Sequence, residues 1–377
     1  MTPARLEARF GRTRFHFGWG AAENLAATAL SLGRRVVIVT SPGCAGHGDW
    51  IRALRDRIAD AGGTAEVLPR IRPNPDVEDI DAVRESAARS DVVIGIGGGS
   101  VLDGSKALAV AAASALPAAD WLRRGTVPND APRKQLVLAP TTAGTGSDLS
   151  FGAILSDRSR GFKGGLRGAA LAADAAVVDP ALTVTMPRAL TAETGFDILT
   201  HAFESYVSRR TTSHARALSM QAVTIVGRML PRVLSDPQDR EARSALSYAS
   251  SMMGLNLAHV GTCLPHRLQY AIGGLAPHIS HPAGLAWIYP VWIHHVYPFV
   301  QEDIADLLDA LGQGRPSSGA DAAARIEAWL AAIGIGTRPT VELDPADLAS
   351  RVTGNLAADP IPAPESRLTT MYEEIFR

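Results

Sequence analysis

The stretch Asp91–Ala113, DVVIGIGGGSVLDGSKALAVAAA, decides the fold. Asp91–Ile96 reads as a buried β-strand, and a glycine-rich turn leads from it directly into a helix. Glycines let a ligand approach the backbone closely, and a helix N-terminus offers free N–H groups to a phosphate. The turn lacks the GxGxxG fingerprint of a standard dinucleotide-binding loop. We predict that it binds a nucleotide phosphate through Gly97, Gly98, Gly99 and Ser100; the alternative is a plain tight turn.

Strands and helices alternate on both sides of this unit. Arg34–Thr40, Ala65–Leu68 and Lys134–Ala139 read as strands, whereas 47–62 and 77–90 read as helices. This alternation indicates an α/β domain with a mostly parallel sheet. Beyond about residue 180 the pattern becomes helical, with Asp321 expected to cap one helix. The helices expected there are 192–208, 213–234, 240–260, 284–297, 304–311, 321–333 and 345–355.

The composition is that of an ordinary globular protein, with 46% hydrophobic and 20% charged residues and a net charge of −1. This balance gives no reason to expect nucleic acid or an anionic membrane as a partner. Two cysteines, Cys44 and Cys263, provide no disulfide framework, so we expect a reducing, cytoplasmic location. The N-terminal sequence MTPARLEARFGRTRF has no apolar signal core, and no apolar run reaches membrane-spanning length.

A second polar loop, Pro140–Asp148 (PTTAGTGSD), follows the strand that ends at Ala139. Its hydroxyl and N–H groups lie at the carboxyl end of the sheet, where α/β proteins bind ligands. The alternative is a loop whose hydroxyls only cap the next element.

Four possible metal ligands occur in the helical half. Asp197 and His201 are four residues apart in a segment with helical spacing, so both side chains lie on one face. His266 and His281 complete a set of one carboxylate and three imidazoles, which suits Fe(II) or Zn(II). The alternative is a solvated helix pair with scattered histidines.

Four blocks in this order resemble the iron-containing (group III) alcohol dehydrogenase family, within the dehydroquinate-synthase-like superfamily. The blocks are GGGSVLDGSK (97–106), PTTAGTGSD (140–148), VVDPALTVTMPRALTAETGFDILTHAFESYVS (177–208) and the pair His266 and His281. FGWGAAENL (17–25) and RPNP (72–75) extend the resemblance, so that it covers nearly the whole chain.

The resemblance implies a Rossmann-like dinucleotide-binding α/β domain at 1–182 and an all-α, metal-binding and catalytic domain at 183–377. The implied cofactor is NAD(P)H, with its pyrophosphate on the glycine-rich turn. The rest of its cleft is implied to comprise Asp103, Thr141, Thr142, Thr145, Ser147 and Lys163, with Leu182 near the adenosine. One divalent metal, Fe(II) in preference to Zn(II), is implied on Asp197, His201, His266 and His281.

The implied reaction is direct hydride transfer between the nicotinamide and a small aldehyde or alcohol whose oxygen the metal polarises. Family members are commonly homodimers or larger, with an N-terminal strand pairing across subunits, and FHFG (15–18) is the candidate strand here. Three alternatives remain. They are a glycerol-dehydrogenase-like polyol dehydrogenase, a metal-free enzyme similar to maleylacetate reductase, and a non-catalytic nucleotide-binding protein.

Two positions near the metal set depart from the family's usual pattern. The interval after His266 is one residue longer than usual, and we choose His281 over His278 because HPAGLAWIYP keeps the family's interval to the following proline. Tyr270 stands where the family often has a histidine near the nicotinamide. A phenol has a much higher pKa than an imidazole, so Tyr270 either takes a different part in proton transfer or fills the pocket wall.

Two further departures bear on specificity. Ser41 occupies a place where NAD-preferring members often carry an acid, and a serine can donate to a ribose phosphate, so we expect NADPH in preference to NADH. His259 and Cys263, shortly before the third ligand, are expected to line the substrate pocket and make it polar. The hypothesis is a short aldehyde with a polar or anionic group; the alternative is that His259 only packs against a neighbouring helix.

Overall fold

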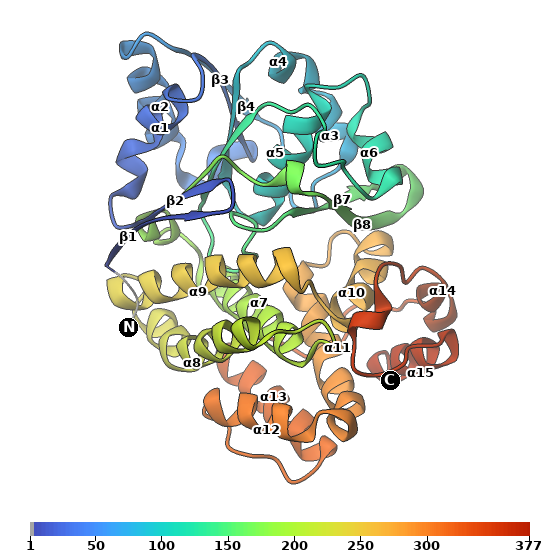
Figure 1. Ribbon diagram of the computed structural model, residues 1–377. Coiled ribbons are helices and arrows are strands. Elements are labelled where there is room, and N and C mark those ends of the chain that lie inside the picture. The colour runs from blue at the N-terminus through green and yellow to red at the C-terminus, as the bar shows by residue number, and fades with distance from the viewer. Residues whose placement is uncertain (1–3) are drawn as a thin grey trace.

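The computed structural model describes residues 4–377, so the first three residues of the predicted 1–182 domain lie outside it. The upper half in Figure 1 is a seven-stranded sheet in the order β1-β2-β9-β6-β5-β3-β4. Its neighbours run parallel except β1 and β2, which form an antiparallel hairpin. The strands are β1 (Arg5–Phe10), β2 (Thr13–Gly18), β3 (Arg35–Thr40), β4 (Thr64–Pro69), β5 (Val92–Gly97), β6 (Gln135–Pro140) and β9 (Ala175–Val178).

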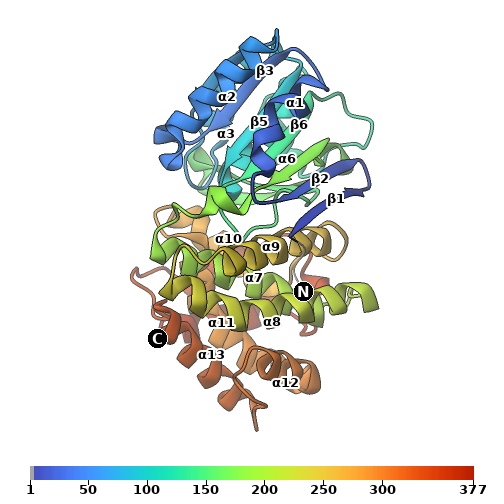
Figure 2. The same ribbon diagram turned by 90° about the vertical axis from the view of Figure 1, so that its left-hand side faces the viewer.

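Helices cover both faces of this sheet, as Figure 2 shows. Successive side chains of a strand point to opposite faces, so Val37 and Val39 pack towards α5 whereas Val36 and Ile38 pack towards α1 and α2. A sheet covered twice needs strands that are apolar on both sides, which explains the continuous apolar runs in the sequence. The helices are α1 (Leu25–Leu30), α2 (Gly48–Asp60), α3 (Val77–Asp81), α4 (Arg84–Ala88), α5 (Gly99–Ala111) and α6 (Ala118–Arg124).

The second half is a helical assembly built around α7, which packs against α8, α9, α11 and α12. Because α7 is enclosed, buried residues occur all round it rather than in one stripe. Figure 1 shows these helices beneath the sheet. They are α7 (Arg188–Val207), α8 (Ser213–Ser235), α9 (Arg240–His259), α10 (Leu264–Leu275), α11 (His281–Val296), α12 (Gln301–Ala310), α13 (Gly319–Ile333), α14 (Pro345–Ser350) and α15 (Glu365–Ile375).

A two-stranded antiparallel ribbon joins the halves. Its strands are β7 (Gly152–Asp157) and β8 (Phe162–Arg167), and it packs against α5 on one side and α10 on the other. The sequence pattern did not predict this ribbon. Its position matters for function because it presents Lys163 and Arg167 to the space between the sheet and the helices.

Several predicted elements need correction. The helix expected at 77–90 is split into α3 and α4, and the one expected at 345–355 ends at Ser350. Ser318, not Asp321, caps α13, because its side chain accepts the hydrogen bond from the Asp321 backbone N–H. Helix α10 was not predicted: ten of its residues are buried, so it has no polar face to reveal helical periodicity.

The strand that contains FHFG is unavailable for pairing with another subunit. It belongs to β2, which lies between β1 and β9 and therefore has both edges occupied within the chain. Strand β1 is the edge on this side of the sheet. Among residues 4–377, no helix has both the length and the apolar character needed to cross a membrane.

A glycine contact fixes the loop after β6 against the helical half. Gly146 has a φ of +59°, and a Cβ added at Gly254 of α9 would lie 2.2 Å from the Gly146 carbonyl oxygen. Real Cβ atoms do not approach a backbone oxygen this closely. The loop and α9 must therefore separate if either glycine gains a side chain.

We predict that Gly254→Ala lowers the free energy of unfolding by about 1–3 kcal/mol, because overpacking at a backbone contact cannot be relieved by a rotamer change. Denaturant unfolding followed by circular dichroism measures this. Gly336→Ala is the control, since an added Cβ there meets nothing within 4 Å. Equal stabilities for the two variants would contradict the proposed contact.

Candidate active site and metal centre

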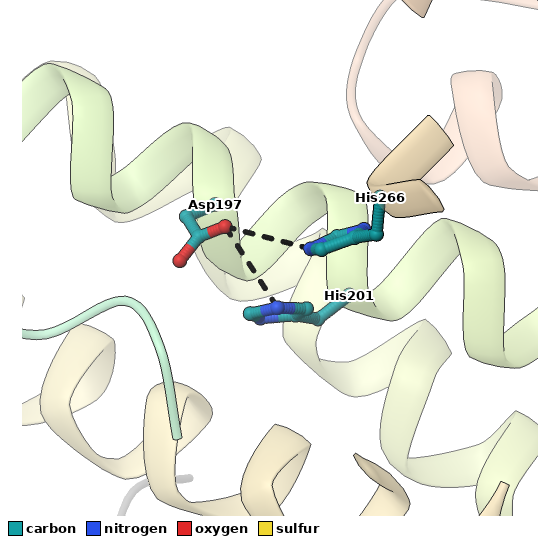
Figure 3. Close-up of side chains that lie close together, drawn as sticks. All are labelled: Asp197, His201 and His266. Atoms are coloured by element: carbon teal, nitrogen blue, oxygen red, sulfur yellow. Dashed lines mark ion pairs between the residues drawn. The ribbon is translucent and has the colours of Figure 1, made fainter. Parts of the chain in front are cut away.

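Helix α7 positions the centre of the site. Asp197 and His201 lie one turn apart on it, and His266 and His281 reach the same point from α10 and α11. The Nε2 atoms of the three histidines lie 3.8, 3.9 and 3.8 Å from Asp197 Oδ1, in sequence order. Figure 3 shows the rings of His201 and His266 directed at this carboxylate. The structure thus brings the four predicted ligands together.

The donor set has the chemistry of a site for a divalent cation. Donor atoms of Asp197, His201 and His266 lie within 4.8 Å of one another, and His281 adjoins this group through Asp197. Burial lowers the pKa of His266 to about 3 and also lowers the pKa of the other two histidines, which favours neutral imidazoles with a free lone pair. Within residues 4–377, Asp197 Oδ1 and His266 Nε2 are buried without a hydrogen-bond partner. A buried polar atom without a partner is unfavourable, and a cation bound between these two atoms would remove that penalty. The residues therefore fit a metal.

His278, the alternative ligand, lies elsewhere. It is exposed in the loop before α11, whereas His281 is the first residue of α11 and faces the cluster. The helix start explains the difference, because Ser280 caps α11 through the Ala283 N–H and so sets the direction of the next side chain.

Glu204 contacts the metal-ligand cluster through His266. The sequence analysis did not single this residue out. Its Oε1 lies 2.7 Å from His266 Nδ1, and its Oε2 accepts a hydrogen bond of 2.7 Å from the Cys263 N–H. The carboxyl group is fully buried, and burial raises the pKa of Glu204 to about 8. A contact at Nδ1 leaves Nε2 as the atom that points at Asp197, so Glu204 orients the ring. The sequence did contain a signal for Glu204, because it lies seven residues after Asp197 and therefore on the same face of the helix.

Gln269 and Asn74 hold the other side of the cluster. Gln269 Oε1 contacts His281 Nδ1 and accepts a 3.4 Å hydrogen bond from Lys163 Nζ. The same ammonium donates to Asn74 Oδ1 at 2.9 Å. Burial lowers the pKa of Lys163 to about 8. Sequence reasoning placed Lys163 in the cleft but missed both amides, of which Gln269 connects it to His281.

A cleft of about 600 Å³ runs from the sheet to the metal ligands. Its floor is the N-terminus of α5, where Gly98 is the N-cap. A Cβ added at Gly99 would lie 2.4 Å from Thr145 Cγ2, so only glycine leaves this cradle open. The predicted residues that line the cleft are Ser41, Gly98, Gly99, Ser100, Thr141, Thr142, Thr145, Asp197 and His281, and unpredicted ones include His47 and Glu193. The cradle and the helix N-terminus fit a dinucleotide pyrophosphate.

Two predicted cofactor residues, Gly97 and Leu182, are not among the residues that line the cleft. Gly97 packs against Val101 at the end of β5, and Leu182 is buried. The carbonyl of Leu182 accepts a hydrogen bond of 3.0 Å from His47 Nε2, and His47 itself lines the cleft. Leu182 therefore acts on the cleft through His47 rather than by direct contact.

Asp103 and Ser147 line a second, smaller cavity rather than the cleft itself. Ser147 Oγ donates to Asp103 Oδ1 at 2.5 Å, and the Ile154 N–H donates to Asp103 Oδ2 at 2.7 Å. Lys106, on the same helix, is fully buried and donates to Ser150 Oγ and the Gly152 carbonyl. These bonds attach the β7–β8 ribbon to α5, so this lysine has a structural role.

The smaller cavity, of about 150 Å³, adjoins the metal ligands. Lys163, Arg167, Thr262 and Tyr270 line it together with Asp197 and the three histidines. Tyr270 is buried, and burial raises the pKa of its phenol, so it is a neutral donor. Its ring stacks at 6.1 Å on the ring of His281.

The positions of His259 and Cys263 require a correction, because neither lines this cavity. His259 is exposed and packs edge-on against Phe151 at 5.9 Å. Cys263 is the fully buried N-cap of α10, and its thiol donates to the Glu204 carbonyl. Both precede His266 in the sequence, but His259 ends α9 on Phe151 and the Cys263 thiol is taken up by Glu204.

Comparison with known proteins places these features in a family. Residues 12–180 match the family model described as iron-containing alcohol dehydrogenase, and residues 191–342 match the model for the C-terminal part of the Fe-containing alcohol dehydrogenase family. Together the two matches cover most of the chain.

Individual relatives agree with these matches. Long-chain-alcohol dehydrogenase 1 of Geobacillus thermodenitrificans is 31% identical, over 96% of this chain and 94% of its own. Sulfoacetaldehyde reductase of Bilophila wadsworthia is 31% identical, over 78% of this chain and 76% of its own. The solved structure of sulfoacetaldehyde reductase from Bifidobacterium kashiwanohense in complex with NAD⁺ superposes with a TM-score of 0.82, at 26% identity and 98% coverage of both chains.

We predict that Glu204→Gln weakens metal binding about 10- to 100-fold, because residues that orient a ligating imidazole have effects of this size. His266 and the Cys263 N–H contact different oxygens of Glu204, and in glutamine one of these oxygens is replaced by an NH₂ group that only donates. Competition with a chromogenic chelator measures the dissociation constant. An unchanged constant in a folded variant would contradict the orienting role.

The choice between the two neighbouring histidines is tested separately. His281→Ala should lose more metal affinity than Glu204→Gln, because His281 contacts Asp197. His278→Ala should keep the affinity of the unaltered chain, because His278 is exposed in the loop before α11. Metal content after dialysis, measured by mass spectrometry, distinguishes them. The reverse order would reassign the fourth ligand.

Proposed function

Because this chain belongs to the iron-containing alcohol dehydrogenase family, we propose that it interconverts small aldehydes and alcohols with NAD(P)H and one divalent metal. One observation carries the proposal: Asp197 and His281 line both the cofactor cleft and the smaller cavity. The ligands thus stand where a nicotinamide and a substrate carbonyl would meet. The set of four donors favours this activity over a metal-free reductase.

In the direction of reduction, the aldehyde gains a hydride at carbon and a proton at oxygen. When bound, the reduced nicotinamide supplies the hydride and the divalent cation supplies Lewis-acid polarisation of the carbonyl. The chain supplies position and exclusion of water. The buried wall of Tyr270 and Leu166 closes the cavity, and the phenol keeps its proton at Oη as a hydrogen-bond donor. No protein nucleophile is required.

The finer assignments extend this proposal. Fe(II) is the preferred metal and Zn(II) the second choice, since both accept one carboxylate and three imidazoles. Residues 1–182 form the dinucleotide-binding domain and 183–377 the catalytic domain, with a homodimer or larger homo-oligomer in the cytoplasm. The preference for NADPH rests on Ser41, which lines the cofactor cleft where an acidic side chain would repel a ribose phosphate.

We predict that Ser41→Asp lowers kcat/KM for NADPH by about tenfold or more and changes that for NADH much less, because a like-charge contact with a phosphate costs several kcal/mol. Initial rates with each cofactor measure this. Ser366→Asp, an exposed position on α15, is the charge-matched control. A preference for NADH in the unaltered chain would contradict the assignment.

Metal removal tests the proposed function itself. Treatment with a strong chelator should abolish aldehyde reduction, and anaerobic addition of Fe(II) or Zn(II) should restore it, because the proposed reaction depends on polarisation of the carbonyl by the metal. A panel of aldehydes with NADPH and NADH gives the rates. Full activity in protein shown to be metal-free would exclude the mechanism.

A further inference from the structure

A third cavity, of about 400 Å³, shares Tyr270 as a lining residue with the smaller cavity beside the metal ligands. It is formed by β8, the turn before α10, and the segment around Gly354. Its charged lining residues are four arginines, Arg123, Arg167, Arg210 and Arg267, and no aspartate or glutamate is among the lining residues described. A cavity with charges of one sign is built for a ligand of the opposite sign.

Two of these arginines have binding capacity that the protein does not use. Arg267 is buried to 6% exposure and donates to Thr262, yet its Nε has no partner within residues 4–377. The guanidinium of Arg167 makes no ion pair in the same range. It lies beside Gly261, 3.5 Å from where a Cβ added to that glycine would be. In contrast, Arg123 is paired with Asp120 and Arg210 donates to the His259 carbonyl. The free donors are therefore those nearest Tyr270.

The charge of the two arginines is not balanced locally. Burial, followed by the charges of Arg267 and Arg210, lowers the pKa of Arg167, so like charges oppose one another there. Glu204 is the carboxyl group that interacts with Arg267, and it is already bonded to His266. An anion between the arginines would offset the repulsion and take up the free N–H groups.

The arginine cavity adjoins the smaller cavity beside the metal ligands. Arg167, Thr262 and Tyr270 line both it and the 150 Å³ cavity beside the metal ligands. A space of 150 Å³ holds a molecule no larger than benzene. One molecule can therefore place a carbonyl at the metal and its other end at the arginines only if the connection is short.

We propose that the substrate is a short aldehyde with a terminal oxyanion, a sulfonate, phosphonate or carboxylate, and that Arg167 and Arg267 bind this anion. The inference rests on the proposed function and names its substrate class. It replaces His259 as the source of a polar pocket, since His259 is exposed on Phe151. Tyr270 lines both cavities, and its ring lies 5.4 Å from the Arg267 guanidinium.

Steady-state kinetics with matched aldehydes test this specificity. The substrates are sulfoacetaldehyde, phosphonoacetaldehyde, malonic semialdehyde and the uncharged propanal, each with NADPH and Fe(II). We expect at least one anionic aldehyde to exceed propanal about 100-fold in kcat/KM, and Arg167→Ala to reduce that ratio about 10- to 100-fold. The ranking of the three anions identifies the oxyanion. A preference for propanal, or a ratio unaffected by Arg167→Ala, would overturn the proposal.

Two controls separate position from charge. Arg124→Ala removes a nearby positive charge from α6, where Arg124 stacks on Trp121 outside the cavity lining, and should keep the ratio. Arg167→Lys keeps the charge but loses the planar fork, so it should restore only part of the ratio. An equal loss in Arg124→Ala would indicate a general field effect and would contradict a site at Arg167. Arg167 lines the cavity and its guanidinium forms no ion pair within residues 4–377, so its substitution breaks no ion pair of the fold.

A binding measurement keeps this inference distinct from the proposed function. Calorimetric titration of the NADP⁺-bound protein with isethionate, hydroxyethylphosphonate or hydroxypropionate, and with propanol as the neutral control, needs no turnover. We expect one anionic alcohol to bind at least tenfold more tightly than propanol, and Arg167→Ala to remove this difference. Failure of every aldehyde to react, with intact anion binding, would refute the proposed function alone. Equal binding of the anionic and neutral alcohols would refute the anion site alone.

Discussion

The site depends on the convergence of three imidazoles on one oxygen of Asp197, buried between helices. Burial keeps the imidazoles neutral and leaves the carboxylate without the hydrogen bonds that water would provide. Such an arrangement is unfavourable by itself, and a divalent cation turns it into a favourable one. The surrounding residues can be understood as means to hold it: Glu204 orients His266, and Gln269 contacts His281.

The second constraint is that the cofactor and the metal must be held by different halves of the chain in one fixed relation. Asn74, in a left-handed conformation with φ +56°, connects them. Its N–H donates to Ser100 at the phosphate cradle, its side-chain oxygen accepts from Lys163, and its Nδ2 donates to the Pro277 carbonyl before α11. Hydride transfer is sensitive to displacements of about 1 Å, so these contacts between the halves bear directly on rate.

Local motifs could be predicted from the sequence, and long-range placements could not. The turn Gly97–Ser100, the alternation of strands and helices and the four metal donors rest on residues close in sequence or on a family resemblance. Sequence proximity to His266 suggested His259 and Cys263 for the pocket, but His259 packs on Phe151 and the Cys263 thiol bonds the Glu204 carbonyl. Arg167 was missed because its strand belongs to a ribbon whose role depends on packing between α5 and α10. Glu204 was within reach, since it continues the helix face of Asp197.

X-ray absorption spectroscopy at the metal edge tests the central claim most directly, using protein reconstituted with one equivalent of Fe(II) or Zn(II). The structure predicts a first shell of nitrogen and oxygen atoms at about 2.0–2.2 Å, with the outer-shell scattering of three imidazoles. His281→Ala should reduce the imidazole contribution to two. A spectrum with fewer than three imidazoles in the unaltered protein, or one that His281→Ala leaves unchanged, would contradict the ligand set on which this account rests.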